Sequence, residues 1–248
     1  MTTVSIITPS YNSSSFISEC VESVLAQTFE NWELIIIDDC SVDCSLEIIE
    51  QFIQKDNRIQ LITLKKNIGA AAARNIAIQK AKGRYIAFLD SDDVWKHDKL
   101  EKQLAFMRTN GFAFTFTAYQ PMSEDGKKMH SVIFAPKIMT YKSYLRNTII
   151  GCLTVIIDRQ QTGDFQMPNI RSSHDMALWL DLMKRGFMAY GLNENLAKYR
   201  IVSSSNTARK WKAANEVWQV YRKLEKLSIM NSVLNFICYV FNAIKKRM

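Results

Sequence analysis

The chain of 248 residues is 48% hydrophobic and 23% charged, which fits one large globular domain with a modest appendage and excludes a disordered chain. No run reaches the roughly 18 to 20 apolar residues of a spanning helix, and five cysteines without a CxxC spacing argue against disulfides or structural zinc, so we expect a reduced, cytoplasmic protein. The net charge of +8 leaves nucleic acid, an anionic membrane surface and phosphate-bearing substrates open as partners.

The N-terminal part alternates between β-branched runs and stretches with helical periodicity. We expect strands at 4–8, at WELIIIDDCS from residue 32, at 58–64 and at 85–90, and helices at 16–27, 45–55 and 69–81. A strand, a helix and another strand in turn, with runs apolar on both faces, predict a parallel sheet. The fold class is therefore α/β, with a doubly wound, mainly parallel central sheet flanked by helices.

Polar side chains gather where three of these strands end. Ligands of such sheets bind outside the carboxyl ends of the strands, so these groups should converge on one cleft. They are Pro9, Tyr11 and Asn12 after the first strand, Asp38, Asp39, Ser41 and Asp43 after the second, and Asp90, Asp92 and Asp93 after the fourth.

The stretch FLDSDDVW, residues 88–95, crowds carboxylates that repel one another. If the strand persists, Asp90 and Asp92 point to the same side and can serve one hard cation directly or through water. Oxygen ligands alone favour Mg²⁺ or Mn²⁺ over zinc and leave positions open for substrate phosphates. The alternative is that Asp90 and Asp92 only cap the following turn.

The second half is less regular. GFAFTFTAYQ and TVIIDR predict further strands, and YKSYLRN begins a helix. In RSSHDMALWLDLMKRGF, residues 171–187, Ser172 or Ser173 starts a helix with an apolar face, and Gly186 ends it. Asp175 lies in the first turn, where a carboxylate can simply stabilise the helix dipole.

The C-terminal region, 206–248, predicts a helical extension. A polar helix from about 209 to 227 precedes VLNFICYVFNAIKKRM, whose apolar part, 233–244, is too short to span a bilayer and is followed by Lys245, Lys246 and Arg247. An interfacial helix with a basic end suits an anionic membrane surface. The alternative is a helix docked on the rest of the chain or on a second subunit, as in a homodimer.

The motifs VSIITPSYN, IIIDDCSVD, NIGAAAARNIAI, GRYIAFLDSDDVW and HDMALWLDLM, in this order, resemble those of family 2 glycosyltransferases with the GT-A fold, over roughly residues 3–205. The resemblance is nearer to bacterial enzymes of O-antigen, capsule and teichuronic acid synthesis. It implies that Pro9 and Tyr11 lie beside the nucleotide base, that Asp39 accepts a hydrogen bond from it, and that Arg74 binds the diphosphate or the base. Cys40 replaces the usual Gly of the second motif.

The resemblance also implies the catalytic groups. The family's DXD is Asp90, Ser91 and Asp92, with Asp92 the metal ligand and Asp90 near the donor sugar or ribose. Asp175 is the base that accepts the proton of an acceptor hydroxyl, so configuration inverts in one displacement. The family usually has Glu where this chain has His174. The donor is expected to be a UDP-sugar, with Mn²⁺ or Mg²⁺ as cofactor.

The resemblance further implies a lipid-linked oligosaccharide acceptor and a place on the inner face of the cytoplasmic membrane. It divides the chain into a catalytic domain, 1–205, with a nucleotide-binding half, 1–95, and an acceptor half, 96–205. The segment from Tyr199 and Arg200 through the Ser run to Arg209 is expected to close over the donor diphosphate, unless it is a solvated linker.

Three other functions compete with this one. A nucleic-acid binder would not place an acidic cleft against phosphates and would show a recognition motif, so we expect no nucleic-acid partner. A phospho-receiver domain would be about half this length. A nucleotide- and metal-binding relative without activity would keep Asp39 and Asp92 but would not need Asp175.

Overall fold

A computed structural model describes residues 2–170, 172–202 and 210–245. The strands are β1 Val4–Ser10, β2 Trp32–Asp38, β3 Ile59–Thr63, β4 Tyr85–Phe88, β5 Val94–Trp95, β6 Phe114–Ser123, β7 Ile138–Met139, β8 Ile156–Asp158 and β9 Ala189–Ile201. The helices are α1 Ile17–Leu25, α2 Ser45–Ile53, α3 Ala70–Lys80, α4 Lys99–Asn110, α5 Tyr141–Arg146, α6 Arg159–Thr162, α7 His174–Lys184, α8 Lys210–Gln219 and α9 Ile229–Lys245, with a π-helical turn, Val220–Leu224, after α8.

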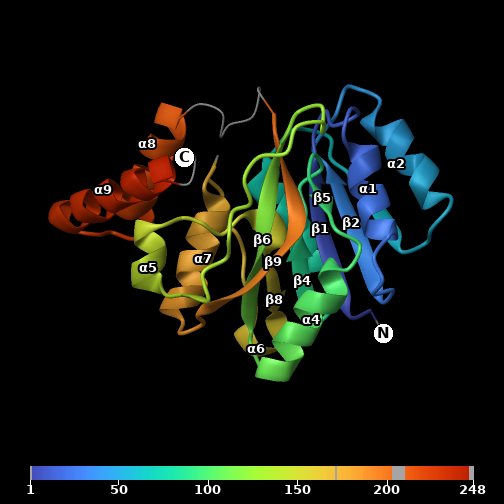
Figure 1. Cartoon of the computed structure of the whole chain (residues 1–248). Helices are drawn as coiled ribbons and strands as arrows, with labels where there is room; N and C mark the ends of the chain where they lie inside the picture. Colours follow the sequence, from blue (N-terminus) through green and yellow to red (C-terminus); the bar gives the residue numbers. More distant parts are fainter. Residues whose placement is uncertain (1, 171, 203–209, 246–248) are drawn as a thin grey trace.

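One sheet runs through the molecule in the order β3-β2-β1-β4-β8-β6-β9-β5, with β7 paired to β9 (Figure 1). The strands β3, β2, β1 and β4 are parallel, as predicted, whereas β8 is antiparallel to both β4 and β6. β6 and β9 are parallel again. The α/β class with a central sheet flanked by helices is confirmed, and its parallel half brings the carboxyl ends of β1, β2 and β4 to one edge.

The predicted end of the fourth strand is wrong. β4 ends at Phe88 rather than at residue 90, so Asp90 and Asp92 lie in a turn and strand alternation does not set their directions. α1 begins after an N-cap at Phe16 without a side-chain cap. The Ser13 hydroxyl lies 2.7 Å from the Ser10 hydroxyl.

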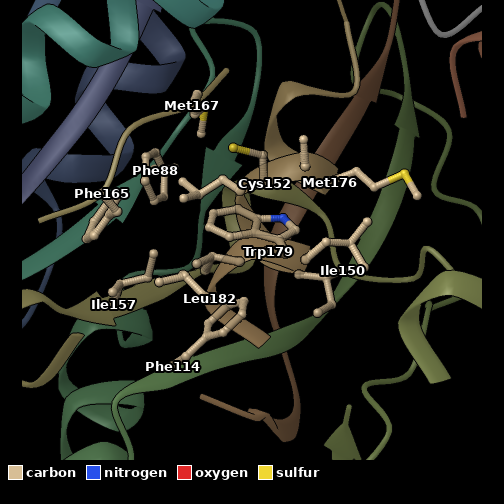
Figure 2. Packing of buried hydrophobic residues seen from close by; sticks show 14 of the residues in the cluster. Phe88, Phe114, Ile150, Cys152, Ile157, Phe165, Met167, Met176, Trp179 and Leu182 are labelled. Carbon is tan, nitrogen blue, oxygen red and sulfur yellow. The ribbon is translucent and has the colours of Figure 1, made fainter. Parts of the chain in front are cut away.

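Helix α7 is fixed in place by Trp179, which is fully buried at its centre. Its ring lies between Phe88 of β4, with ring centres 5.5 Å apart, and Phe114 of β6, at 5.3 Å (Figure 2). The aromatic packing therefore ties α7 to strands from both halves of the sheet. The first turn of α7, which carries His174 and Asp175, is positioned by this contact.

The C-terminal region forms two helices, α8 and α9. They are joined through the π-helical turn, where Tyr221 is buried and its hydroxyl donates to the Leu145 carbonyl. α9 then docks against α5, with Asn242 donating to the Arg146 carbonyl at 3.0 Å. In Figure 1, α8 and α9 form one end of the molecule, and α2 lies at the other.

The opposite side of α9 is apolar and exposed. Its exposed residues are Ile229, Met230, Val233, Leu234, Ile237, Val240 and Phe241, with exposed fractions of 36% to 71%. We call these seven residues the outer face of α9. Within the described ranges, no helix combines the length and the apolar character that crossing a bilayer requires.

Candidate active site

A cleft of about 410 Å³ opens at the carboxyl edge of the parallel strands. Its walls include six of the seven residues that the sequence predicts for the site: Pro9, Tyr11, Asp39, Arg74, Asp90 and Asp92. Tyr11 is 52% exposed, so its side chain is accessible to a ligand in the cleft. The fold therefore gathers these groups from β1, β2, α3 and the turn after β4.

The loop after β1 is held to the loop after β2 by side-chain hydrogen bonds. The backbone N–H of Asn12 donates to the Ser41 hydroxyl at 2.9 Å, and the Asn12 side chain accepts from Val42 N–H. Asp43 accepts from Ser14 N–H at 3.0 Å. Burial opposes ionisation of Asp43, but hydrogen bonds from Ser45 and Ser14 lower its pKa to about 2. The sequence placed Asp43 in the cleft, whereas the structure uses it as a clamp between the two loops.

Asp39 is nearly buried and organises the entry to α3. Its two carboxylate oxygens accept the backbone N–H groups of Ile68 and Gly69, both at 2.7 Å. Gly69, at the N-cap of α3, has φ +87°, a conformation that favours glycine. A carboxylate oxygen has two acceptor positions, so Asp39 can still accept from a ligand in the cleft. Its predicted contact with a base stays a prediction.

Arg74 joins the cleft to α7. It is buried, and its guanidinium pairs with the Asp90 carboxylate through Nη2 while Nη1 lies 2.5 Å from His174 Nε2. Burial alone would lower the pKa of Arg74, but the charge of Asp90 holds it above its ordinary value. Arg74 therefore lies inside the fold, between the cleft and α7.

Asp175 does not line the cleft. It is half-buried in the first turn of α7, directly after His174, and its charge acts on both Arg74 and the buried Tyr144. The cleft and Asp175 are connected through Arg74 and His174 rather than by direct contact. Its role as a base stays a prediction.

The turn after β4 is held by Arg200 of β9, which the sequence placed over the donor diphosphate. Arg200 is buried. Its backbone N–H donates to the Asp93 carboxylate at 2.8 Å, and its side-chain Nε donates to the Asp92 carbonyl, also at 2.8 Å. The same guanidinium pairs with Glu19 of α1. Arg200 thus stabilises the acidic turn through hydrogen bonds. No local pattern in the sequence could have indicated this contact, because Arg200 is far from the turn along the chain.

The carboxylate of Asp92 fits a divalent cation. Burial, and then repulsion from Asp90, raise the pKa of Asp92 to about 6, so a bound cation would stabilise its ionised form. The described residues contain no group of three or more acidic, His or Cys side chains that could hold a metal ion. One protein carboxylate suits Mg²⁺ or Mn²⁺, which take their other ligands from water and substrate phosphates.

A second, larger cleft of about 500 Å³ shares no residue with the first and is lined by side chains such as Asn75, Asp181 and Lys184. It lacks the strand-end carboxylates, so we do not assign the chemistry to it. The Ser run and Arg209, expected to close over a diphosphate, lie outside the described residues.

Residues 5–161 match the family described as Glycosyl transferase family 2. The chain is 54% identical over 245 residues to the putative teichuronic acid biosynthesis glycosyltransferase TuaG of Bacillus subtilis, covering 99% of this chain and 97% of TuaG. It is 40% identical over 218 residues to the UDP-Glc:alpha-D-GlcNAc-diphosphoundecaprenol beta-1,3-glucosyltransferase WfgD of Escherichia coli, covering 88% of this chain and 84% of WfgD.

The fold is also similar to a solved structure, the mannosyltransferase PcManGT of Pyrobaculum calidifontis in complex with GDP-Man and Mn²⁺. The TM-score is 0.71 at 15% identity, covering 95% of this chain and 68% of PcManGT. At this identity the likeness shows the GT-A fold alone.

Proposed function

This chain belongs to glycosyl transferase family 2, and we propose that it moves a sugar from a nucleotide-sugar, specifically a UDP-sugar, to a hydroxyl of a lipid-linked saccharide. The cleft that unites Tyr11, Asp39, Arg74, Asp90 and Asp92 carries this proposal. WfgD, by its name, uses UDP-Glc and a diphosphoundecaprenol-linked acceptor, and TuaG is named for teichuronic acid synthesis. By analogy the product belongs to a bacterial surface polysaccharide.

The donor binds across the cleft, with its base beside Pro9 and Tyr11 and within reach of Asp39. Asp175 accepts the proton of the acceptor hydroxyl, whose oxygen attacks the anomeric carbon as the bond to the diphosphate breaks, with inversion. A divalent cation held by Asp92 would neutralise charge that grows on the departing diphosphate. Asp90 orients the ribose or the donor sugar, and its pairing with Arg74 holds it in place.

A lipid-linked acceptor places the enzyme at a membrane surface. In our proposal residues 1–205 form the catalytic domain, and the outer face of α9 rests on the inner face of the cytoplasmic membrane. Apolar side chains on one side of a helix and a basic end, here Lys245, Lys246 and Arg247 in the sequence, suit an anionic leaflet.

The test combines donor binding with transfer. We expect UDP with Mn²⁺ or Mg²⁺ to raise the melting temperature more than dTDP, GDP or CMP, since a ligand that binds only the native state stabilises it. Asp92→Ala should abolish the metal-dependent part. Asp175→Asn should keep this shift but slow transfer of sugar to a GlcNAc-diphospho-lipid by about 10²–10⁴-fold.

Asp181→Asn is the matched control, because Asp181 lies on the same helix with its side chain half exposed. It should transfer at the wild-type rate. Full activity in Asp175→Asn would refute the base. Nucleotide binding without transfer to any acceptor by the wild-type chain would favour the non-catalytic alternative.

A further inference from the structure

His174 joins the first turn of α7 to the buried Arg74. It is the first residue of α7, it is 9% exposed, and it precedes the proposed base. Its Nε2 lies 2.5 Å from Arg74 Nη1. A guanidinium nitrogen only donates hydrogen bonds, so Nε2 must be the acceptor. The imidazole is therefore neutral, with its proton on Nδ1.

This contact completes a chain of groups from three separate elements. Asp90 follows β4 and lines the cleft, Arg74 belongs to α3, and His174 starts α7. Both terminal nitrogens of Arg74 are thereby engaged, while its buried Nε has no partner among the described side chains. The donor cleft and the first turn of α7 are joined through one guanidinium.

We propose that neutral His174 is a positioning residue that, through Arg74, aligns Asp175 with a donor held at Asp90, and that protonation of His174 uncouples the two. The proposal rests on the proposed function. An imidazolium presents an N–H to the Arg74 cation, so the hydrogen bond is lost and two positive charges meet. The first turn of α7 then shifts away from the cleft. A glutamate here would instead stay paired with Arg74 well below neutral pH.

The charges that face His174 act in both directions. Its own burial and the Arg74 cation lower the pKa of His174 below its ordinary value, whereas Asp175 on its own helix and Asp90 across the contact raise it. The balance keeps the ring neutral at neutral pH. The coupling should therefore fail only as the pH falls below about 6.5, the ordinary value for histidine.

The kinetic test compares three substitutions over about pH 5 to 8. His174→Leu removes the acceptor and should lower kcat about tenfold or more at every pH with little change in the donor KM, since misplacing a reacting group costs rate. His174→Gln, whose carbonyl oxygen accepts from Arg74 without titrating, should restore most of that loss and flatten the acidic limb. His174→Glu should behave like the glutamine variant.

His97→Gln and His130→Gln are the controls, because both histidines are exposed and outside the cleft. They should keep the wild-type pH profile. Wild-type kcat and an unchanged acidic limb in both His174→Leu and His174→Gln would overturn the proposal.

A measurement without turnover separates this proposal from the enzyme assignment. The chain has three histidines, so ¹⁵N resonances of the side chains can be assigned with the same control variants. We expect His174 in the Nδ1–H form, with a titration midpoint below the ordinary value for histidine that moves in Arg74→Gln. A His174 midpoint at the ordinary value, unchanged in Arg74→Gln, would refute the link. Absence of transfer in the wild type would instead refute the proposed function, and the titration would still decide the link.

Discussion

Cys40 holds a backbone conformation that most side chains avoid. Its φ is +67°, in the left-handed region, at the turn where β2 gives way to the cleft. The turn lets Asp38 bind Ser41 through both its N–H and its hydroxyl, while the next residue, Asp39, reaches Ile68 and Gly69. A glycine would adopt this conformation freely, whereas the Cβ of Cys40 is crowded in it.

Substitution of Cys40 tests this reading. A Cβ in the left-handed region costs roughly 1–2 kcal/mol, and Cys40→Gly removes that cost. The glycine also raises the conformational entropy of the unfolded chain, which lowers the free energy of unfolding by about 0.4–1 kcal/mol. We expect Cys40→Gly to raise the free energy of unfolding by about 0–1.6 kcal/mol. Cys40→Val should lose about 1–2 kcal/mol, since branching at Cβ worsens the clash. Urea denaturation measures both, and a valine variant as stable as wild type would contradict the reading.

At the scale of elements, the start of α4 contains a buried lysine. Lys99 is fully buried, with Nζ 2.7 Å from Gln103 Oε1 and 4.3 Å from the centre of the Trp95 ring. Burial lowers the pKa of Lys99 to about 7. The lysine therefore links α4 to β5, and its amine is only partly protonated near pH 7.

This shift predicts a pH dependence of stability. Between about pH 7 and pH 10 the unfolded chain binds the Lys99 proton and the native chain does not, so the free energy of unfolding rises with pH, by at most about 1.4 kcal/mol per pH unit from this group. Below about pH 7 both states are protonated and the penalty is constant. Lys99→Met should remove this slope, whereas Lys96→Met, at a partly exposed neighbour, should keep it. Denaturation midpoints across this range measure it, and an unchanged slope in Lys99→Met would reject the shifted pKa.

The helices and strands differ in how far the sequence predicts them. Local periodicity is enough to find β1, β2, β3 and the helices between them, because each element's apolar pattern lies within its own residues. The pairing of β6 with β9, the support of the acidic turn by Arg200, and the Arg74–His174 contact join residues far apart in the chain. Such contacts depend on the packed fold, so no local pattern contains them.

At the scale of the whole molecule, α9 has two different sides. One side packs against α5. The segment that leads into α9 is held by Tyr221, whose hydroxyl donates to the Leu145 carbonyl. Glu225 in the same segment accepts from the Tyr141 hydroxyl at 2.6 Å and pairs with Lys184 at 3.1 Å. These contacts fix the helix as part of the folded body, which was one of the two interpretations of the C-terminal sequence. They leave the outer face of α9 uncovered, at the end of the molecule opposite α2 (Figure 1). Docking and membrane binding are therefore compatible.

Vesicle binding decides what covers that face. We expect the full chain to sediment with vesicles rich in phosphatidylglycerol and to bind less at high salt, because apolar insertion and attraction to anionic lipid act together. Replacing Leu234, Ile237 and Phe241 by Ser should weaken binding about tenfold or more. Phe134→Ser with Met188→Ser, two exposed apolar residues away from α9, is the control and should bind as wild type. The wild type could instead fail to bind vesicles and form a dimer that the α9 triple variant does not form. In that case the outer face of α9 binds a second copy of the chain, and membrane attachment through α9 is wrong.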